Sequence, residues 1–258
     1  MFGVPSPRGM KNTTLLFAAS AVLLAASFST PCLAQAAAAP QFYRVTLTHV
    51  KPDMLNEWLD LQKNEVVPAL KKAGQKTRTV LVTSLFGNAY EYLVITPFEK
   101  YAEFDEGPPL TKALGQAAAA RLNDKLRKCV DSSTSYSNTR LMDISNILEG
   151  PLPSRMVTVR YRIAPGKMTD FENLVKSEIL PVYKKAKVPL LVSRRGPGAN
   201  TTDVTMTTGI TKYADLDGGP FLTKQLGQEA VNRINAKFTG IRTLIEVVVR
   251  NRVDDLSF

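Results

Sequence analysis

The chain contains very little histidine, cysteine and tryptophan: its 258 residues include one His, two Cys and one Trp. A structural zinc site takes four ligands, mostly Cys and His, so the sequence excludes a site of that kind. We predict no metal and no cofactor. Ligation of haem by histidine would depend on His49 alone, which lies in a predicted strand. The chain also lacks a Gly-x-Ser-x-Gly nucleophile elbow, and its glycine spacing fits neither a phosphate-binding loop nor a dinucleotide fingerprint.

Long hydrophobic runs are also missing beyond the N-terminus. Residues 1–36 combine a basic start, a short apolar stretch over residues 15–26 and a zone of small residues. This pattern predicts a signal peptide, cleaved after Ala34 or Ala36. We therefore expect an exported protein, periplasmic or extracellular, with no membrane span after cleavage. Translation from Met1 or from Met10 fits the pattern equally.

Removal of the signal peptide leaves one cysteine and a basic protein. Cys32 lies in the signal peptide, so Cys129 remains alone and no intrachain disulfide is expected. The formal net charge is +10, and the loss of Arg8 and Lys11 lowers it to +8. This charge favours anionic partners or simply solubility. The sequence has no aromatic and basic nucleic-acid motif, so we predict no nucleic-acid binding.

The mature chain repeats itself. Residues 65–73 match residues 178–186 at an offset of 113, and residues 107–116 match residues 219–228 at an offset of 112. The order of the matches is the same in both copies, which indicates a tandem repeat. We place the domain boundaries as follows: repeat 1 at residues 42–148, a linker at 149–154 and repeat 2 at 155–258.

Each copy has the same predicted order of elements, β-α-β-β-α-β, which is the ferredoxin-like unit. In the first copy we expect strands at residues 43–50, 79–86, 91–96 and 132–142, with helices between them. In the second copy the strands are expected at 157–163, 190–194, 203–208 and 244–253. Pro68 and Pro181 interrupt the first helix of each copy, so we expect a kink or a break there. Two such units can put their uncovered sheet faces together, and the predicted fold is one α+β barrel with a central cavity.

The sequence resembles the dimeric α+β-barrel superfamily, in particular its NIPSNAP-like branch. The residues that carry the resemblance are Tyr43-x-Val45, Glu57-Trp58 and residues 66–74, with a second set in copy two. The resemblance implies a barrel whose members include cofactor-free monooxygenases, isomerases, haem enzymes and proteins of no known activity. Where NIPSNAP-like domains carry a Trp-x-Tyr stretch, this chain has residues 97–101, Pro-Phe-Glu-Lys-Tyr.

The candidate ligand-binding residues lie on predicted strands. Alternation places His49 on the same face as Val45 and Leu47. The aligned position in copy two is Arg162, with Arg160 on the same face. If this face lines the cavity, the three side chains form a cationic floor that would bind a carboxylate, with His49 as a proton acceptor. The alternative is a strand face open to water.

Two further features have competing interpretations. Tyr90 and Tyr92 are expected to share one face of the third strand, either lining the cavity or packing against the helices. The block Gly-Pro-x-Leu-Thr-Lys-x-Leu-Gly-Gln occurs in both copies. It either presents an anion-binding helix N-terminus or begins a helix whose Gly115 and Gly227 are needed for close packing.

From the sequence we predict an exported barrel that binds a small anionic or aromatic molecule between its sheets. A cofactor-free monooxygenase or isomerase is the first alternative, and a structural or interaction module with a filled core is the second. The identity of the ligand and the oligomeric state are left open, a homodimer included.

Overall fold

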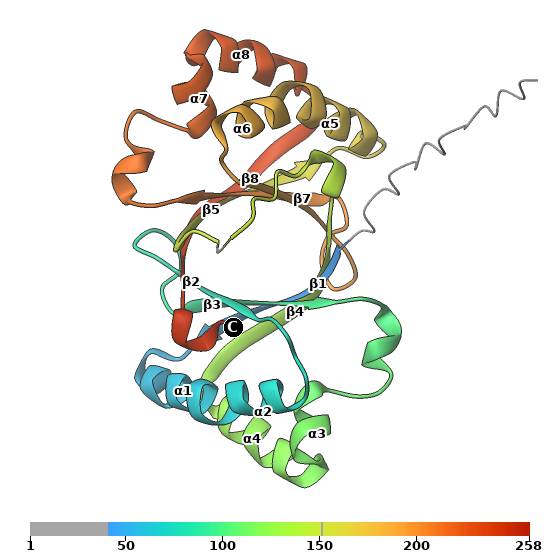
Figure 1. The fold of residues 1–258 in the computed structure, drawn as a ribbon, viewed down its shortest axis with the longest axis vertical. Helices are drawn as coiled ribbons and strands as arrows, with labels where there is room; N and C mark the ends of the chain where they lie inside the picture. Colours follow the sequence, from blue (N-terminus) through green and yellow to red (C-terminus); the bar gives the residue numbers. More distant parts are fainter. Residues whose placement is uncertain (1–40, 151) are drawn as a thin grey trace, which may run out of the picture. The chain divides into compact units, whose positions relative to one another are not determined.

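Eight antiparallel strands form a closed barrel, in the order β1-β3-β2-β8-β5-β7-β6-β4 (Figure 1). The computed structural model describes residues 41–150 and 152–258, and the predicted signal peptide lies outside the described residues. The strands are β1 Gln41–Val50, β2 Thr79–Thr83, β3 Glu91–Phe98, β4 Val130–Arg140, β5 Arg155–Ile163, β6 Leu190–Arg195, β7 Asp203–Ile210 and β8 Arg242–Arg252.

The two halves of the barrel have the same topology. Within the closed order, the first half contributes β4-β1-β3-β2 and the second half contributes β8-β5-β7-β6. The halves join where β2 pairs with β8 and where β4 pairs with β6. The predicted α+β barrel of two β-α-β-β-α-β units is thereby confirmed. A common origin of the two halves by duplication stays a prediction.

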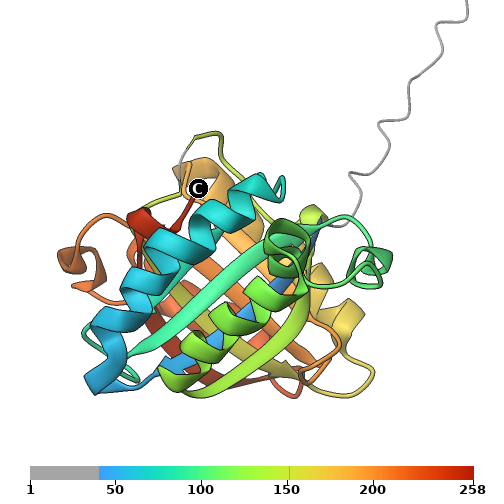
Figure 2. The same cartoon turned by 90° about the horizontal axis from the view of Figure 1, so that it is seen from below.

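Helices cover the outer face of each half, and Figure 2 shows those of the first half lying side by side across their strands. The helices are α1 Leu55–Leu61, α2 Val67–Lys72, α3 Pro109–Leu114, α4 Gln116–Lys128, α5 Met168–Leu174, α6 Leu180–Ala186, α7 Phe221–Leu226 and α8 Gln228–Lys237. One core around Trp58 fills the space under the first set, and a second core around Phe171 fills the space under the other. Among the described residues, no helix is long and apolar enough to cross a bilayer.

The two prolines in the first helix of each half do not break it. A π-helical segment, Gln62–Val66, precedes Val67 and Pro68, and another, Val175–Ile179, precedes Leu180 and Pro181. Proline removes one backbone donor and crowds the preceding turn. A locally wider turn accommodates both effects, so the chain continues as α2 and α6.

Gly115 and Gly227 have a different role from the one expected. Their φ angles are +77° and +80°, and a Cβ on either glycine would meet nothing within 4 Å. Close packing is therefore not the reason for glycine. Glycine is needed at these positions because it adopts the left-handed backbone conformation readily. That conformation ends α3 and α7 and starts α4 and α8 in a new direction.

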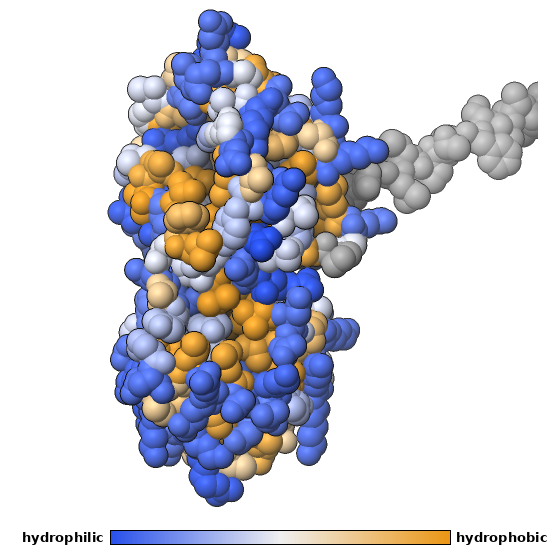
Figure 3. Space-filling view, turned by 90° about the vertical axis from the view of Figure 1, so that its left-hand side faces the viewer, coloured by the Kyte–Doolittle hydropathy of each residue, from blue (hydrophilic) through white to orange (hydrophobic). Residues whose placement is uncertain are grey.

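The outer surface mixes polar and apolar side chains. Figure 3 shows apolar patches on both halves of one face, separated by polar residues. On β8, Leu244 and Val247 are 57% and 58% exposed. The residues of β4 at the equivalent places in the sheet are Ser133 and Ser135, so the outward aliphatic residues are particular to the second half.

Candidate functional site

The interior of the barrel contains a cavity of about 690 Å³. Ligand pockets commonly enclose roughly 300–1,000 Å³. Successive side chains of a strand point to opposite faces, so every second residue of the strands contributes to the cavity wall. The strands contribute an aliphatic part made of Val45, Leu47, Leu81, Leu93, Ile95, Met156, Leu191 and Val248, and the segment between β4 and β5 adds Ile147, Leu148, Leu152 and Pro153.

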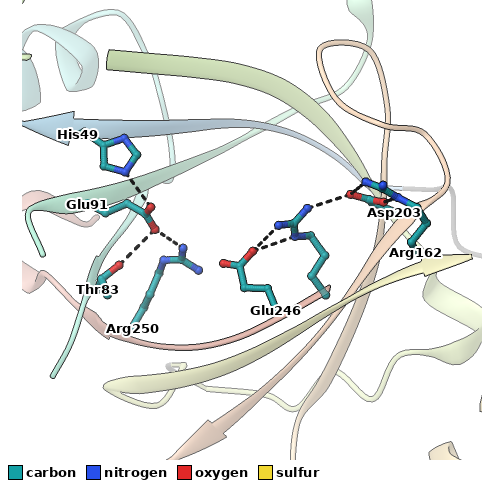
Figure 4. Close-up of polar contacts among 8 residues, drawn as sticks. His49, Thr83, Glu91, Arg162, Asp203, Glu246 and Arg250 are labelled. Atoms are coloured by element: carbon teal, nitrogen blue, oxygen red, sulfur yellow. Dashed lines mark hydrogen bonds and ion pairs between the residues drawn. The ribbon is translucent and has the colours of Figure 1, made fainter. Parts of the chain in front are cut away.

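His49 lies on the inner face of β1, as the alternation with Val45 and Leu47 predicts. Its Nδ1 is 3.0 Å from Ser132 Oγ. Its Nε2 is 3.0 Å from Glu91 Oε2, as Figure 4 shows. His49 is not among the residues that line the 690 Å³ cavity. It therefore belongs to a polar network beyond the cavity, with both ring nitrogens engaged.

Glu91 is the centre of that network. Its Oε1 accepts hydrogen bonds from Arg250 Nη2 and from Thr83 Oγ1, the latter at 3.2 Å. The side chains of Glu91 and Arg250 are each 7% exposed. Burial opposes ionisation of Glu91, but the hydrogen bond and charge of Arg250, together with His49, outweigh it and hold the pKa of Glu91 below its ordinary value. A charged Glu91 therefore compensates a buried guanidinium group.

A second network lies in the other half of the barrel. Asp203, with a side chain only 1% exposed, accepts hydrogen bonds from Arg162 Nε at 2.9 Å and from Arg160 Nη1 at 3.1 Å. Arg160 also donates to Glu246 Oε2 through Nε at 2.9 Å and Nη2 at 2.6 Å. Burial again opposes ionisation, and the two arginines more than offset it, so the pKa of Asp203 is lowered. Arg160 and Arg162 do line the cavity, with their charges already matched by carboxylates.

The two networks occupy equivalent places in the two halves. The offset of 113 relates His49 to Arg162, and the offset of 112 relates Glu91 to Asp203. Each acid is the first residue of its strand, β3 or β7. Neither acid was predicted as a site residue from the sequence. The signal that could have found them is this shared acidic position at the start of the third predicted strand of each copy.

Six arginines line the cavity: Arg140, Arg160, Arg162, Arg195, Arg250 and Arg252. Four of them form ion pairs with Glu91, Asp203, Glu246 and Asp254. Within residues 41–150 and 152–258, Arg140 and Arg195 have no carboxylate partner, and their buried Nε atoms have no hydrogen-bond partner. The sequence analysis did not single out either residue as a binding candidate.

Aromatic rings hold these two arginines in place. The Arg140 guanidinium lies 5.1 Å from the centroid of the Tyr43 ring, and that of Arg195 lies 4.5 Å from the centroid of Tyr136. Burial raises the pKa of the Tyr136 phenol, although the charge of Arg195 acts in the opposite direction. Tyr136 is therefore a neutral hydroxyl group at neutral pH.

Tyr90 and Tyr92 do not share a face of β3, and of the two expected placements the packing against the helices is right for Tyr92 alone. Tyr90 precedes β3, has a φ of +62° and is 40% exposed. Tyr92 pairs with Thr48, the neighbour of His49, so its side chain points to the opposite face from His49. Its ring packs 4.4 Å from that of Trp58, under the helices. Neither tyrosine lines the cavity.

The repeated Gly-Pro block is also remote from this site. None of residues 105–116 or 217–228 lines the cavity. The helices that follow the two prolines, α3 and α7, have six residues each. The block therefore begins short helices and turns the chain.

The cavity does not fit a histidine-ligated haem. His49 is the only histidine in the sequence, and its ring nitrogens contact Ser132 and Glu91 outside the cavity wall. In the described part of the chain, no three His, Cys, Asp or Glu side chains are grouped to hold a metal ion.

No protein-family model matches the sequence, and no curated protein does. Solved structures share the fold. A provisionally named monooxygenase from Lactobacillus acidophilus NCFM is 8% identical with a TM-score of 0.54, covering 84% of this chain and 95% of its own. An anthrone oxidase-like protein is 11% identical with a TM-score of 0.55, covering 83% and 91%. A provisionally named dyp-type peroxidase from Shewanella oneidensis is 10% identical with a TM-score of 0.52, covering 83% and 94%. At these identities the likeness shows an α+β barrel and no activity.

Proposed function

We propose that the protein binds a small organic molecule, anionic or aromatic, inside the barrel. The observation that carries this proposal is the cavity of about 690 Å³, which combines an aliphatic wall with guanidinium groups. Pockets of this size with a few polar groups are typical of ligand sites. Arg160 and Arg162 remain predicted contacts for the ligand, and Arg140 and Arg195 join them. His49 would act from the adjoining polar network.

A cofactor-free monooxygenase or isomerase is the alternative function. Such an enzyme needs a proton acceptor within hydrogen-bond reach of its bound substrate. The only histidine contacts Glu91 and Ser132 and lies outside the cavity wall. The carboxylates of Asp203 and Glu246 do line the cavity, but they are paired with Arg160 and Arg162, so the geometry favours binding over this chemistry. A structural module with a filled core is less well supported, because close-packed interiors leave few voids larger than a water molecule.

The proposal includes export. Residues 1–36 have the pattern of a signal peptide, so the ligand would be met in the periplasm or outside the cell. We also propose a NIPSNAP-like relationship and a duplicated ancestral unit, supported by the match of residues 65–73 to residues 178–186.

Native mass spectrometry on protein purified from its exported form tests the binding function. We expect a mass that exceeds the polypeptide by a small molecule, and a polypeptide that begins after Ala34 or Ala36. A Leu93→Trp variant serves as the control, since Leu93 lines the cavity and an indole there would fill part of it. Loss of the extra mass in a folded Leu93→Trp variant places the ligand in the barrel. A bare polypeptide mass from the unaltered protein under gentle conditions contradicts the proposal.

A further inference from the structure

Arg140 and Arg195 lie diagonally across the pairing between β4 and β6. Arg140 is opposite Ser193, and Arg195 is opposite Asn138. Diagonal positions on neighbouring strands are roughly 7–8 Å apart. Both arginines line the cavity, so their side chains start from neighbouring positions on the same patch of wall.

Arg140 and Arg195 differ from the other arginines of the cavity wall in having no carboxylate partner in the described part of the chain. The other four arginines of the cavity are neutralised by carboxylates of the chain. A buried charge without a partner is costly, and a buried donor without an acceptor adds to that cost. Among the described residues, the Nε donors of Arg140 and Arg195 have no hydrogen-bond partner. The protein therefore maintains an unfavourable arrangement that an anion would relieve.

The two guanidinium groups are also oriented before any anion arrives. Arg140 lies over the Tyr43 ring and Arg195 over the Tyr136 ring. Each ring covers one face of a guanidinium group, which leaves the edge of its N–H groups to donate in plane. Carboxylates accept two parallel hydrogen bonds from such an edge.

Another part of the cavity wall is apolar. Leu81, Met156 and Leu191 form a buried cluster, with Leu93 and Ile95 packed against it, and all five side chains line the cavity. A ligand that reaches both this cluster and the arginines must carry its charge at one end of an apolar body.

We propose that Arg140 and Arg195 bind the carboxylate of an aromatic monocarboxylic acid whose ring lies against Leu81, Met156 and Leu191. This inference rests on the proposed binding function and specifies its ligand class. The volume of about 690 Å³ is large enough for a body of one or two fused rings.

A matched pair of probes tests the inference by titration calorimetry. 2-Naphthoate has the proposed carboxylate, and 2-naphthalenemethanol has the same ring system without a charge. We expect naphthoate to bind roughly 10- to 100-fold more tightly, because a hydrogen bond to a charged group is worth about that factor. Arg140→Met and Arg195→Met should each remove most of this advantage and leave the affinity for naphthalenemethanol within about threefold. Arg195→Gln provides a second variant with a polar side chain.

Arg44→Met is the matched control. Arg44 is exposed and lies on β1 between Tyr43 and Val45, which line the cavity, so its side chain points outward. The control loses the same net charge and should bind both probes as the unaltered protein does. Its behaviour separates a local carboxylate site from a general effect of positive charge.

The outcomes distinguish the two proposals. Equal affinity for the two probes, unchanged in both arginine variants, overturns the carboxylate site and leaves the binding function standing. Inorganic phosphate that displaces naphthoate at equal concentration also overturns it, because the apolar body would then contribute nothing. Failure of both probes to bind, in a protein that carries no bound molecule by mass spectrometry, overturns the binding function itself.

Discussion

Replacement of Glu91 by glutamine should destabilise the protein strongly. The change keeps the size of the side chain and removes its charge, leaving Arg250 buried beside a neutral amide. Both side chains are 7% exposed, so water cannot take over the role of the carboxylate. Removing one partner of a buried ion pair typically costs about 3–5 kcal/mol. For a domain of this size the loss corresponds to a fall in unfolding temperature of roughly 6–20 °C.

Urea denaturation followed by circular dichroism measures this loss as a free energy of unfolding. The matched control is Glu106→Gln, since Glu106 also pairs with a basic residue, Lys112, but is 71% exposed. Exposed pairs contribute about 0–1 kcal/mol, so the control should change stability by less than that. The Glu91→Gln, Arg250→Met double variant should lose much less stability than the two single variants lose together, because it leaves no buried charge without a partner.

The reasoning fails if the free energy of unfolding of Glu91→Gln is within about 1 kcal/mol of that of the unaltered protein, as is expected for the exposed control. Strict additivity in the double variant would refute it as well, because it would show that Glu91 and Arg250 do not interact in the folded state.

Three further outcomes follow from the same contacts. The pKa values of Glu91 and Asp203 are lowered in the folded state. The stability that these two acids provide is therefore present above their unfolded pKa values, near pH 4, and is lost as the pH falls through their lower folded pKa values. Urea titrations at pH 7, 5, 4 and 3 should show a free energy of unfolding that declines below about pH 4.3. Gly198→Ala should lower the free energy of unfolding more than Gly218→Ala does in the same urea assay. Both glycines have positive φ, but only a Cβ on Gly198 would meet the backbone of β4. An equal loss of about 1–2 kcal/mol in both variants would contradict this. Arg195→Met should raise the unfolding temperature, because it removes a charge that has no carboxylate partner among the described residues and a buried Nε donor that has no acceptor there. A lower unfolding temperature in a scanning calorimeter would count against that account.

The fold was open to prediction because its signals are local and occur twice. Alternation along β1 put His49 on the face of Val45 and Leu47, and alternation along β5 put Arg160 and Arg162 on one face. Which side of the sheet these faces take was left open, and in the structure both are inner faces. The two prolines were expected to kink or break the helix, and the sequence did not reveal that a π-helical turn would accommodate each one. A proline in the sequence shows that the helix loses one backbone N–H donor and that the preceding turn is crowded. How the helix accommodates these effects depends on how it packs against the sheet.

The cavity site was harder to predict because it depends on contacts between distant segments. Arg140 and Arg195 become neighbours only through the pairing of β4 with β6, and Arg250 reaches Glu91 only through the pairing of β8 with β2. Neither pairing leaves a mark on the sequence. Arg140 was visible as one member of a repeated pair with Arg252, yet the repeat says nothing about which arginine is matched by an acid.

The error at Tyr92 has a simple physical origin. The strand was assumed to extend back through Tyr90, whereas the chain turns there with a positive φ. The register of β1 with β3 then places Glu91, not Tyr92, opposite His49. A shift of one residue exchanges the inner and outer faces of a strand, which is why an acid occupies the inner position and a tyrosine packs under the helices.

A crystal structure with 6-bromo-2-naphthoate tests the central claim most directly, because the anomalous signal of bromine locates the ring independently of the fitted coordinates of the ligand. The account predicts a bromine peak inside the barrel, beside Leu81 and Leu191, with the carboxylate within hydrogen-bond distance of Arg140 and Arg195. A bromine peak outside the barrel, or a carboxylate turned away from both arginines, would contradict it.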